Sequence, residues 1–311
     1  MDFGTLYQLR TLINRRNVVA DVTKDMTACE EFMELITNAY VISAATHIGV
    51  VCNVKELASK IMSSDNQLAA VTSIAKTLCS KMVNLHTTAA DTMEPTDSSL
   101  DRVLEYSKEV LSLGLLLMEF KDAIREGDGL RVLRCWKYFF LFFRATNHKN
   151  YCIEALHFLM QYYYLLPRRY AEQMLWGRFV NTRGGLGNNI SADLHMEHLN
   201  RLLKDMVSHL GANKTPCAIV RASKALGILN TILEDLDKYT TKKHTTRSDS
   251  EDLLKVVEEL CQNNVFCSQP GRKHHSFPAM KSNKLLMSID KEKVKKWMAN
   301  KTANIIKVSP L

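Results

Sequence analysis

The stretch Val110-Leu-Ser-Leu-Gly-Leu-Leu-Leu-Met118 decides the fold class of this 311-residue chain. It lies in the middle of a helical pattern that covers residues 100–126 and ends at Gly127. Its residues are apolar on nearly every side of a helix, which is typical of a helix inside a core. We therefore expect residues 100–126 to form a long helix buried deep in the protein.

The segments on both sides of this helix also show apolar residues three and four positions apart, the spacing of amphipathic helices. Ser98 or Ser99 is suited to cap the central helix, Asp128 opens the next one, and Thr215 followed by Pro216 is a typical helix start. Further helices are predicted over residues 26–48, 65–85, 128–145, 150–166, 167–180, 191–210, 215–238, 250–262 and about 290–300. No segment alternates with period two, and glycine and proline are scarce. The sequence therefore predicts an all-α, multi-helix globular fold.

The positive charge of the chain is concentrated at its C-terminal end. The net charge is +8, and residues 268–311 carry ten Lys and Arg against two acids, so the rest of the chain is neutral. A basic tail of this kind can contact DNA or carry a nuclear address. The alternative is a solvated, partly ordered terminus. We divide the chain into a helical domain (1–238), a polar linker (239–250) and a basic helical tail (251–311).

Cysteine use and hydropathy point to the inside of a cell. The eight cysteines form no Cys-x-x-Cys pair and lie mostly in apolar helical patterns, as reduced core thiols do. The longest apolar runs fall well short of the ~20 residues that a membrane helix needs, and residues 1–19 lack the apolar segment of a signal peptide. We expect an intracellular protein without a membrane partner, in the nucleus if the tail is an address and otherwise in the cytoplasm.

The helix predicted over residues 128–145 is unusually aromatic, with Trp136 and Phe143 near the ends of the run. Such rings can stack on nucleic-acid bases. The run is almost free of charge, however, and uncharged aromatic runs are typical of cores. We therefore expect these rings to pack inside the domain.

The candidate catalytic and binding residues lie in one stretch, Asn181-Thr-Arg-Gly-Gly-Leu-Gly-Asn-Asn-Ile-Ser-Ala-Asp-Leu-His-Met-Glu-His-Leu-Asn-Arg-Leu-Leu-Lys204. Its first part is a loop in which glycines permit backbone conformations that other residues avoid. Amides of such a loop beside a helix N-terminus can hold an anion, and nearby arginines add positive charge. The loop residues are Gly184, Gly185, Gly187, Asn188 and Asn189, and the arginines are Arg178 and Arg183.

The second part of this stretch is a helix with a polar stripe. At about 100° per residue, Asp193, Glu197, Asn200 and Lys204 share one side, with Arg201 at its edge. Two carboxylates one turn apart can share a divalent cation, and an amide or ammonium group beside them can orient a phosphate. The apolar face, a quarter-turn away, is predicted to be buried, which would make the stripe the wall of a cleft.

A purely structural interpretation of the same residues stays open. Asp193 in a first turn suits the helix dipole, Glu197 and Arg201 have the spacing of a helical ion pair, and the loop can be a tight connection. The loop matches neither a P-loop nor a dinucleotide-binding fingerprint.

Three motifs resemble an uncharacterised family of large, transposon-associated proteins that carry a domain of unknown function. The first is Asn-Thr-Arg-Gly-Gly-x-Gly-Asn-Asn-Ile followed by Asp-Leu-His-x-Glu-His-x-Asn-Arg-x-x-Lys, over residues 181–204. The others are Leu-Tyr-x-Leu-Arg-x-Leu-Ile-Asn-Arg-Arg-Asn-Val, within residues 5–18, and Arg-Cys-Trp-Lys-Tyr with Asn-Tyr-Cys-Ile-Glu-Ala-Leu, within residues 134–161. By this resemblance, residues 4–238 correspond to the C-terminal half of the family domain.

The resemblance implies a layout similar to an RNase H-like transposase, in which two upstream aspartates and a late helical acid bind two metal ions. By analogy, Glu197, or in second place Asp193, is the third acid, and residues 20–180 are a helical insertion. Mg²⁺ or Mn²⁺ would be the cofactor of such a complete domain. The two upstream acidic segments are missing from this sequence, so we expect no catalysis and no cofactor for this chain alone.

Three hypotheses follow. The first is an N-terminally truncated, transposon-derived protein that binds DNA through its basic tail and through Arg178, Arg183, Asn200, Arg201 and Lys204. The second is a metal-dependent nuclease or transposase that is active when the N-terminal half is present. The third is a helical scaffold for protein interactions.

Overall fold

The computed structural model describes residues 10, 13, 26–51, 53–83, 101–239, 249–273 and 289–308. The described chain is helical apart from one short β-hairpin, which confirms the all-α prediction. It divides into two compact units. Unit 1 comprises residues 1–118 and 247–290, and unit 2 comprises residues 119–246 and 291–311. The domain limits of the sequence analysis stay a prediction.

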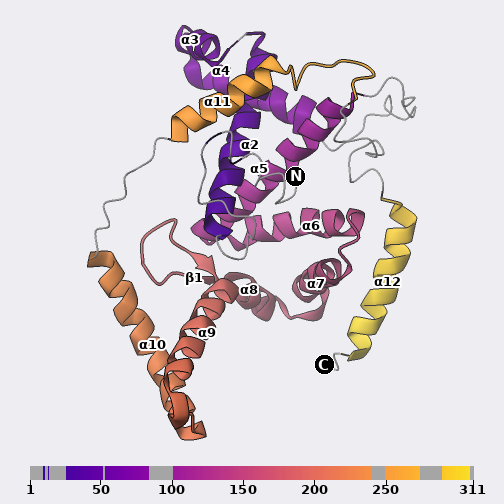
Figure 1. Ribbon diagram of the computed structural model, residues 1–311. Helices are drawn as coiled ribbons and strands as arrows, with labels where there is room; N and C mark the ends of the chain where they lie inside the picture. The colour runs from indigo at the N-terminus through magenta and orange to yellow at the C-terminus, as the bar shows by residue number, and fades with distance from the viewer. Residues whose placement is uncertain are drawn as a thin grey trace. The chain divides into compact units, whose positions relative to one another are not determined.

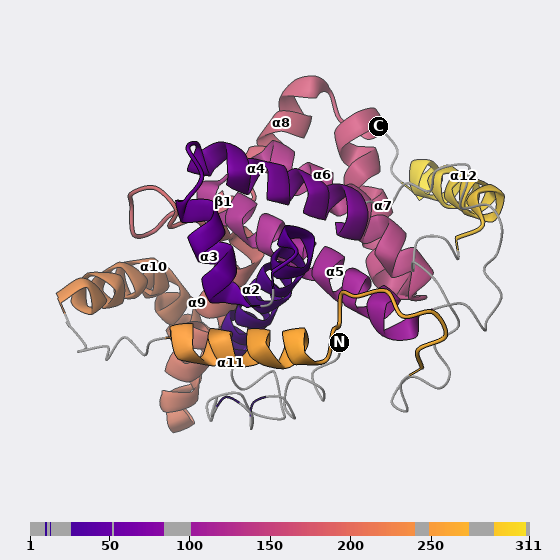
Figure 2. The ribbon, with the colours of Figure 1, turned by 90° about the horizontal axis from the view of Figure 1, so that it is seen from above.

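Unit 1 is built around α2 (Met26–Gly49). On it pack α3 (Val54–Met62), α4 (Gln67–Leu78) with the π-helical turn η1 (Cys79–Val83), and α11 (Asp249–Gln262). Figures 1 and 2 both show α11 alongside α2, although about 200 residues separate them in the sequence. Asn53 and Asn66 cap α3 and α4, each by accepting a hydrogen bond from a backbone amide of the first turn.

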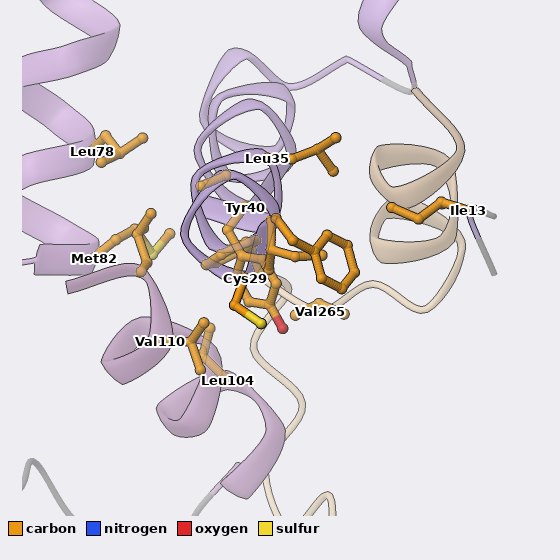
Figure 3. Close-up of a cluster of buried hydrophobic side chains, with 14 of the residues drawn as sticks. Ile13, Cys29, Leu35, Tyr40, Leu78, Met82, Leu104, Val110 and Val265 are labelled. Carbon is orange, nitrogen blue, oxygen red and sulfur yellow. The ribbon is translucent and has the colours of Figure 1, made fainter. Parts of the chain in front are cut away.

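The core of unit 1 collects apolar side chains from five separate parts of the chain. Figure 3 shows Leu35 and Tyr40 of α2 with Val110 of α5 (Arg102–Glu126) and with Val265, which follows α11. Phe32 and Leu111 are fully buried there. Burial, with the nearby Tyr106 hydroxyl, raises the pKa of Tyr40 far above its usual range, so this phenol stays neutral.

The central helix, α5 (Arg102–Glu126), belongs to unit 1 up to Met118 and to unit 2 from Glu119. Its N-cap is Asp101, whose Oδ1 accepts hydrogen bonds from the amides of Val103 and Leu104. Ser98 and Ser99, the predicted caps, lie outside the described residues. The prediction of burial on all sides was wrong in part, because Leu117 is 38% exposed.

Unit 2 contains α6 (Gly129–Ala145), α7 (Lys149–Met160) with the π-helical turn η3 (Gln161–Leu165), α8 (Arg168–Trp176) and α12 (Lys291–Val308). Asp128 caps α6 as expected, since its Oδ1 accepts a hydrogen bond from the Arg131 amide at 3.0 Å. The aromatic run of α6 mainly packs inward, with Phe140 and Phe142 buried, whereas Tyr138 is 45% exposed. Edge-to-face contacts link Phe120, Trp136, Phe139 and Phe158.

The remainder of unit 2 is the β-hairpin β1 (Phe179–Val180) and β2 (Ile190–Ser191), followed by α9 (Ala192–His209), the short 3₁₀ turn η4 (Gly211–Asn213) and α10 (Pro216–Tyr239). Phe179 pairs with Ser191 and Val180 with Ile190 in an antiparallel register. Figure 1 shows α9 and α10 side by side. The predicted helix over 167–180 was therefore too long, because it ends at Trp176 and a strand follows.

No single helix of the described chain has the length and apolar composition of a membrane span; the bent pair of α2 and α3 passes that test only when taken together.

Candidate functional site

The loop of residues 181–189 closes the β-hairpin of unit 2. Gly184, Gly185 and Gly187 all have φ between +71° and +77°, the left-handed region that side chains other than glycine rarely adopt. Three glycines are thus needed to turn the chain within nine residues, as the sequence suggested.

Asparagine side chains hold the loop in shape from within. Asn181 accepts a hydrogen bond from the Gly184 amide at 2.7 Å and donates one to the Gly185 carbonyl at 2.8 Å. Asn188 donates to the Gly184 carbonyl, also at 2.8 Å. These side chains replace the backbone bonds that a loop of this length lacks.

Asn189 fastens the loop to the C-terminal end of α5. Its backbone amide and its side-chain Nδ2 both donate to the Arg125 carbonyl, at 3.2 and 2.7 Å. That carbonyl belongs to the last turn of α5, where the helix itself supplies no donor. Gly127 comes so close to Asn189 that a Cβ on it would lie 3.1 Å from Nδ2. The asparagines and glycines of this loop therefore have a structural role as a tight connection.

Arg178 lies at the base of the hairpin. Its guanidinium carbon is 4.1 Å from the centre of the Phe158 ring, and its Nε is buried without a hydrogen-bond partner in the described part of the chain. Burial lowers the pKa of Arg178, and the negative charge of Asp193 partly offsets that effect. Arg178 thus interacts with Phe158 of α7 and with Asp193 at the start of α9.

The polar stripe of α9 is in contact with solvent. Asp193, Glu197, Asn200, Arg201 and Lys204 are all exposed. Within the described residues, no ion pair joins Glu197 to Arg201, although their spacing predicts one. Arg183, in the loop, is likewise exposed and forms no ion pair in this part of the chain.

The predicted buried face of α9 was wrong. No residue of α9 is buried, and Met196 is 53% exposed. The helix packs on α10, which is itself largely exposed, so the two form a hairpin with few neighbours. The stripe is therefore an open surface along α9.

The part of the chain that the structure describes places no third metal ligand beside the α9 carboxylates. The described residues contain no group of three or more His, Cys, Asp or Glu side chains that could hold an ion. Asp193 and Glu197 supply two carboxylates on one helix, whereas two-metal chemistry needs ions ~3.5–4 Å apart, held by several ligands. The assignment of Glu197 or Asp193 as a third acid stays a prediction about a larger assembly of residues.

Two features were missed by the sequence analysis. One is a cavity of about 330 Å³ in unit 1, between α2 and α11, with Phe32, Tyr40 and Leu260 in its wall. The other is a set of exposed aromatic side chains around the turn η3 in unit 2. Three consecutive tyrosines, Tyr162 to Tyr164, shortly before Arg168 and Arg169, were the available signal for this surface.

Comparison with known proteins identifies a family. The sequence model of a family of unknown function, DUF6589, matches residues 2–250. No curated protein and no solved structure matches the chain. The matched range contains the loop, α9 and α10, and it ends at the start of α11.

Proposed function

The chain belongs to the DUF6589 family, and we propose that it binds nucleic acid through cations of the hairpin loop and along α9. The proposal rests on three cationic side chains, Arg183, Arg201 and Lys204. All three are exposed to solvent, and none forms an ion pair within the described residues. Such cations are available to phosphates, which supply most of the affinity in non-specific binding.

The binding we propose is modest and insensitive to sequence. Asp193 and Glu197 lie on the same stripe and repel phosphates, so the local field is only weakly positive. Arg178 holds the base of the hairpin and contributes its charge from a half-buried position. The basic tail adds exposed cations on α12, such as Lys296. Asn200 and the loop residues would then act by positioning these cations.

We also propose that the chain has a transposon-derived origin and an RNase H-like ancestry. This proposal rests on the resemblance of the motif over residues 181–204, and in it Glu197, or else Asp193, descends from a metal-binding acid. Nuclease activity with Mg²⁺ or Mn²⁺ would require further carboxylates beside these two. A nuclear location would follow from DNA binding.

A helical scaffold for protein partners is the second candidate, because of the exposed apolar side chains on α9 and α10. Large exposed apolar patches mark interaction sites in soluble proteins. The residues concerned are Leu194, Met196, Ile219, Val220, Ile228, Leu229 and Ile232.

A salt series of fluorescence anisotropy with a labelled 20-base-pair duplex tests the first proposal. Each phosphate contact contributes about 0.9 to the slope of log affinity against log salt. We expect the triple variant Arg183→Ala/Arg201→Ala/Lys204→Ala to lower that slope by about 2.7 and to bind far more weakly at 50 mM salt.

The matched control removes three exposed lysines of unit 1, Lys55→Ala/Lys76→Ala/Lys81→Ala, and it should leave the slope nearly unchanged. Absence of duplex binding by the unmodified protein at 50 mM salt would reject nucleic-acid binding. Equal losses in the two triple variants would reject the assigned residues. Self-association that is abolished by Ile228→Ser and Ile232→Ser would favour the scaffold.

A further inference from the structure

The turn η3 carries a surface that neither the hairpin loop nor α9 shares. We call it the tyrosine surface and define it as Lys137, Tyr163, Tyr164, Arg168 and Trp176, all in unit 2. Its rings face solvent, since Tyr164 is 84% exposed and Tyr163 and Trp176 are each 46% exposed. Aromatic side chains of this size normally lose most of their exposure on folding, so their position calls for a cause other than core packing.

Ring and cation–π contacts connect most of these residues. The rings of Tyr163 and Tyr164 lie 6.4 Å apart between centroids, and the Lys137 ammonium lies 5.0 Å from the centre of the Tyr163 ring. Tyr163 also forms a T-shaped contact with the buried Tyr162 ring at 5.0 Å, and the Arg168 guanidinium lies 5.6 Å from the centre of the Tyr162 ring. Cations therefore lie beside the rings of this surface.

Glu172 fixes the far end of this surface. Its carboxylate accepts hydrogen bonds from the Trp176 indole at 3.0 Å and from the Tyr162 hydroxyl at 3.2 Å, and it forms an ion pair with Arg168. The Trp176 ring also lies close to Gly129 at the start of α6. These contacts hold the indole in a defined orientation while almost half of it stays exposed, which is how a preformed binding surface is kept ready.

The charge of this surface favours an anionic partner. Lys137, Arg168 and Arg169 are exposed there, with 77% of the Arg168 side chain open to solvent. Glu172 forms an ion pair with Arg168, and its oxygens also accept hydrogen bonds from Tyr162 and Trp176. A partner that brings both negative charge and flat rings matches this combination of cations and aromatic side chains.

Single-stranded nucleic acid has this combination of properties. Its unpaired bases can stack on exposed rings, and its phosphates can contact neighbouring cations. The bases of a duplex are already stacked on one another and present their faces to no side chain. A π-helical turn such as η3 is itself often found at functional sites.

We propose that the tyrosine surface binds single-stranded nucleic acid, with Tyr163, Tyr164 and Trp176 stacking on bases and Lys137 and Arg168 contacting phosphates. This site goes beyond the cations of the hairpin loop and α9 and shares no residue with them. The two sites are therefore separable by substitution.

The test compares a labelled dT20 strand with a 20-base-pair duplex in fluorescence anisotropy at 50 mM salt, with the full chain. Replacement of an aromatic side chain that stacks on a base weakens single-strand binding by at least about fivefold. We expect the double variant Tyr163→Ala/Tyr164→Ala to show this loss for dT20 and to keep its affinity for the duplex. Tyr163→Phe/Tyr164→Phe keeps both rings and should bind dT20 like the unmodified protein.

Two further variants guard against misfolding and indirect effects. Tyr151→Ala removes a tyrosine of α7 that is 63% exposed but lies outside the surface, and it should change nothing. Lys137→Glu leaves every ring in place and should weaken dT20 binding by reversing one charge. Circular dichroism melting of each variant verifies that the fold is kept.

Photocrosslinking supplies an independent readout, since a dT20 strand with 5-iodouracil should attach to the peptide that contains Tyr163 and Tyr164. Failure of the unmodified protein to bind dT20, or unchanged dT20 affinity in Tyr163→Ala/Tyr164→Ala, would overturn the proposal. If dT20 affinity is unchanged and Tyr163→Ala/Tyr164→Ala no longer binds a protein partner that the unmodified protein binds, the surface is a protein-binding site instead. Duplex binding that depends on Arg183, Arg201 and Lys204 would still stand in either case, so the two proposals fail separately.

Discussion

At the scale of single residues, Asp101 does more than cap a helix. Its Oδ1 accepts hydrogen bonds from the amides of Val103 and Leu104 and from Arg272 Nε at 2.9 Å. Its Oδ2 accepts from the Gln269 amide and from Arg272 Nη2, both at 2.8 Å. One carboxylate thus joins the start of α5 to a segment 170 residues later in the chain, with both ionic partners largely buried.

Replacement of this carboxylate should be costly. Asp101→Asn removes the charge that Arg272 faces and replaces one acceptor oxygen by a donor. Loss of one partner from a buried ion pair typically lowers the free energy of unfolding by about 3–5 kcal/mol. We expect a loss near the lower end, measured by urea denaturation at pH 7, because Arg272 also donates to the carbonyls of Asn264 and Val265. Glu105→Gln, which breaks a half-buried pair with Lys108 one helical turn away, should cost under about 1 kcal/mol.

The same carboxylate predicts how stability responds to acid. Burial disfavours its charged form, but the hydrogen bonds from Arg272, Leu104 and Gln269 and the Arg272 charge outweigh this, and the pKa of Asp101 lies below its usual value. A lowered pKa in the folded state means that the stabilisation is complete above the unfolded pKa of about 3.9 and disappears as pH falls through the folded pKa. The difference between the unmodified protein and Asp101→Asn should therefore be constant above about pH 5 and shrink below about pH 4. A difference independent of pH would contradict this assignment.

At the scale of elements, α5 lies directly against Thr37 of α2 at Gly114. A Cβ at this position would lie 2.3 Å from Oγ1 and 2.8 Å from Cγ2 of Thr37, which is itself buried. Thr37 Oγ1 donates to the Met33 carbonyl one turn earlier, which fixes the side chain in place. Glycine is required there by the neighbouring helix and not by its own backbone angle.

Gly114→Ala should therefore lower the free energy of unfolding by about 1–3 kcal/mol through overpacking. Thr37→Ala removes the two atoms that clash and should restore most of this loss in the double variant. A double-mutant cycle by thermal unfolding measures the coupling between the two positions. Additive losses would show that the helices separate at this point in solution.

The helices were largely predictable because apolar spacing, Asp128, Pro216 and similar local signals act within one helical turn. The predictions that were wrong concerned features that depend on the tertiary structure. The spacing on α9 indicated a buried face, but spacing cannot reveal whether a neighbour covers it, and the structure leaves Met196 exposed. The strand at Phe179 is too short to show alternation, and it exists because the partner strand at Ile190 returns beside it.

The candidate site was predictable in position but not in role. Glycines and asparagines at 184–189 marked an unusual loop, and the positive φ angles agree with that interpretation. The bond from Asn189 to the Arg125 carbonyl is long-range, so no local pattern could indicate that the loop serves as an anchor for α5. The exposure of the η3 tyrosines was not predicted for a related reason, because a run of aromatic residues has the same composition in a core and on a surface.

At the scale of the whole molecule, unit 1 is assembled from two segments that lie on either side of residues 119–246 of unit 2 in the sequence. The family match ends at residue 250, whereas α11 continues to Gln262 and is followed by Val265 and Phe266, which enter the core of unit 1. Val257 of α11 is fully buried, and Phe266 meets the Tyr40 ring edge-to-face at a centroid distance of 5.9 Å. The residues that complete this core thus lie just beyond the matched range.

A pair of truncations tests this dependence. Chain 1–273 keeps α11, Phe266 and Arg272, while chain 1–246 lacks them, and both lack α12, so that the comparison isolates the contribution to unit 1. Burial of a Val or Phe side chain contributes about 1.5–3 kcal/mol each, and the loss of the Asp101–Arg272 pair adds to it. The sum is comparable to the roughly 5–15 kcal/mol that stabilises a typical domain.

We therefore expect chain 1–273 to unfold cooperatively. Chain 1–246 should bind a hydrophobic dye at room temperature and lose the cooperative transition of unit 1. Equal melting temperatures and equal dye binding in the two chains would mean that α11 is dispensable, and that the core between α2 and α5 is stable without residues beyond the family match.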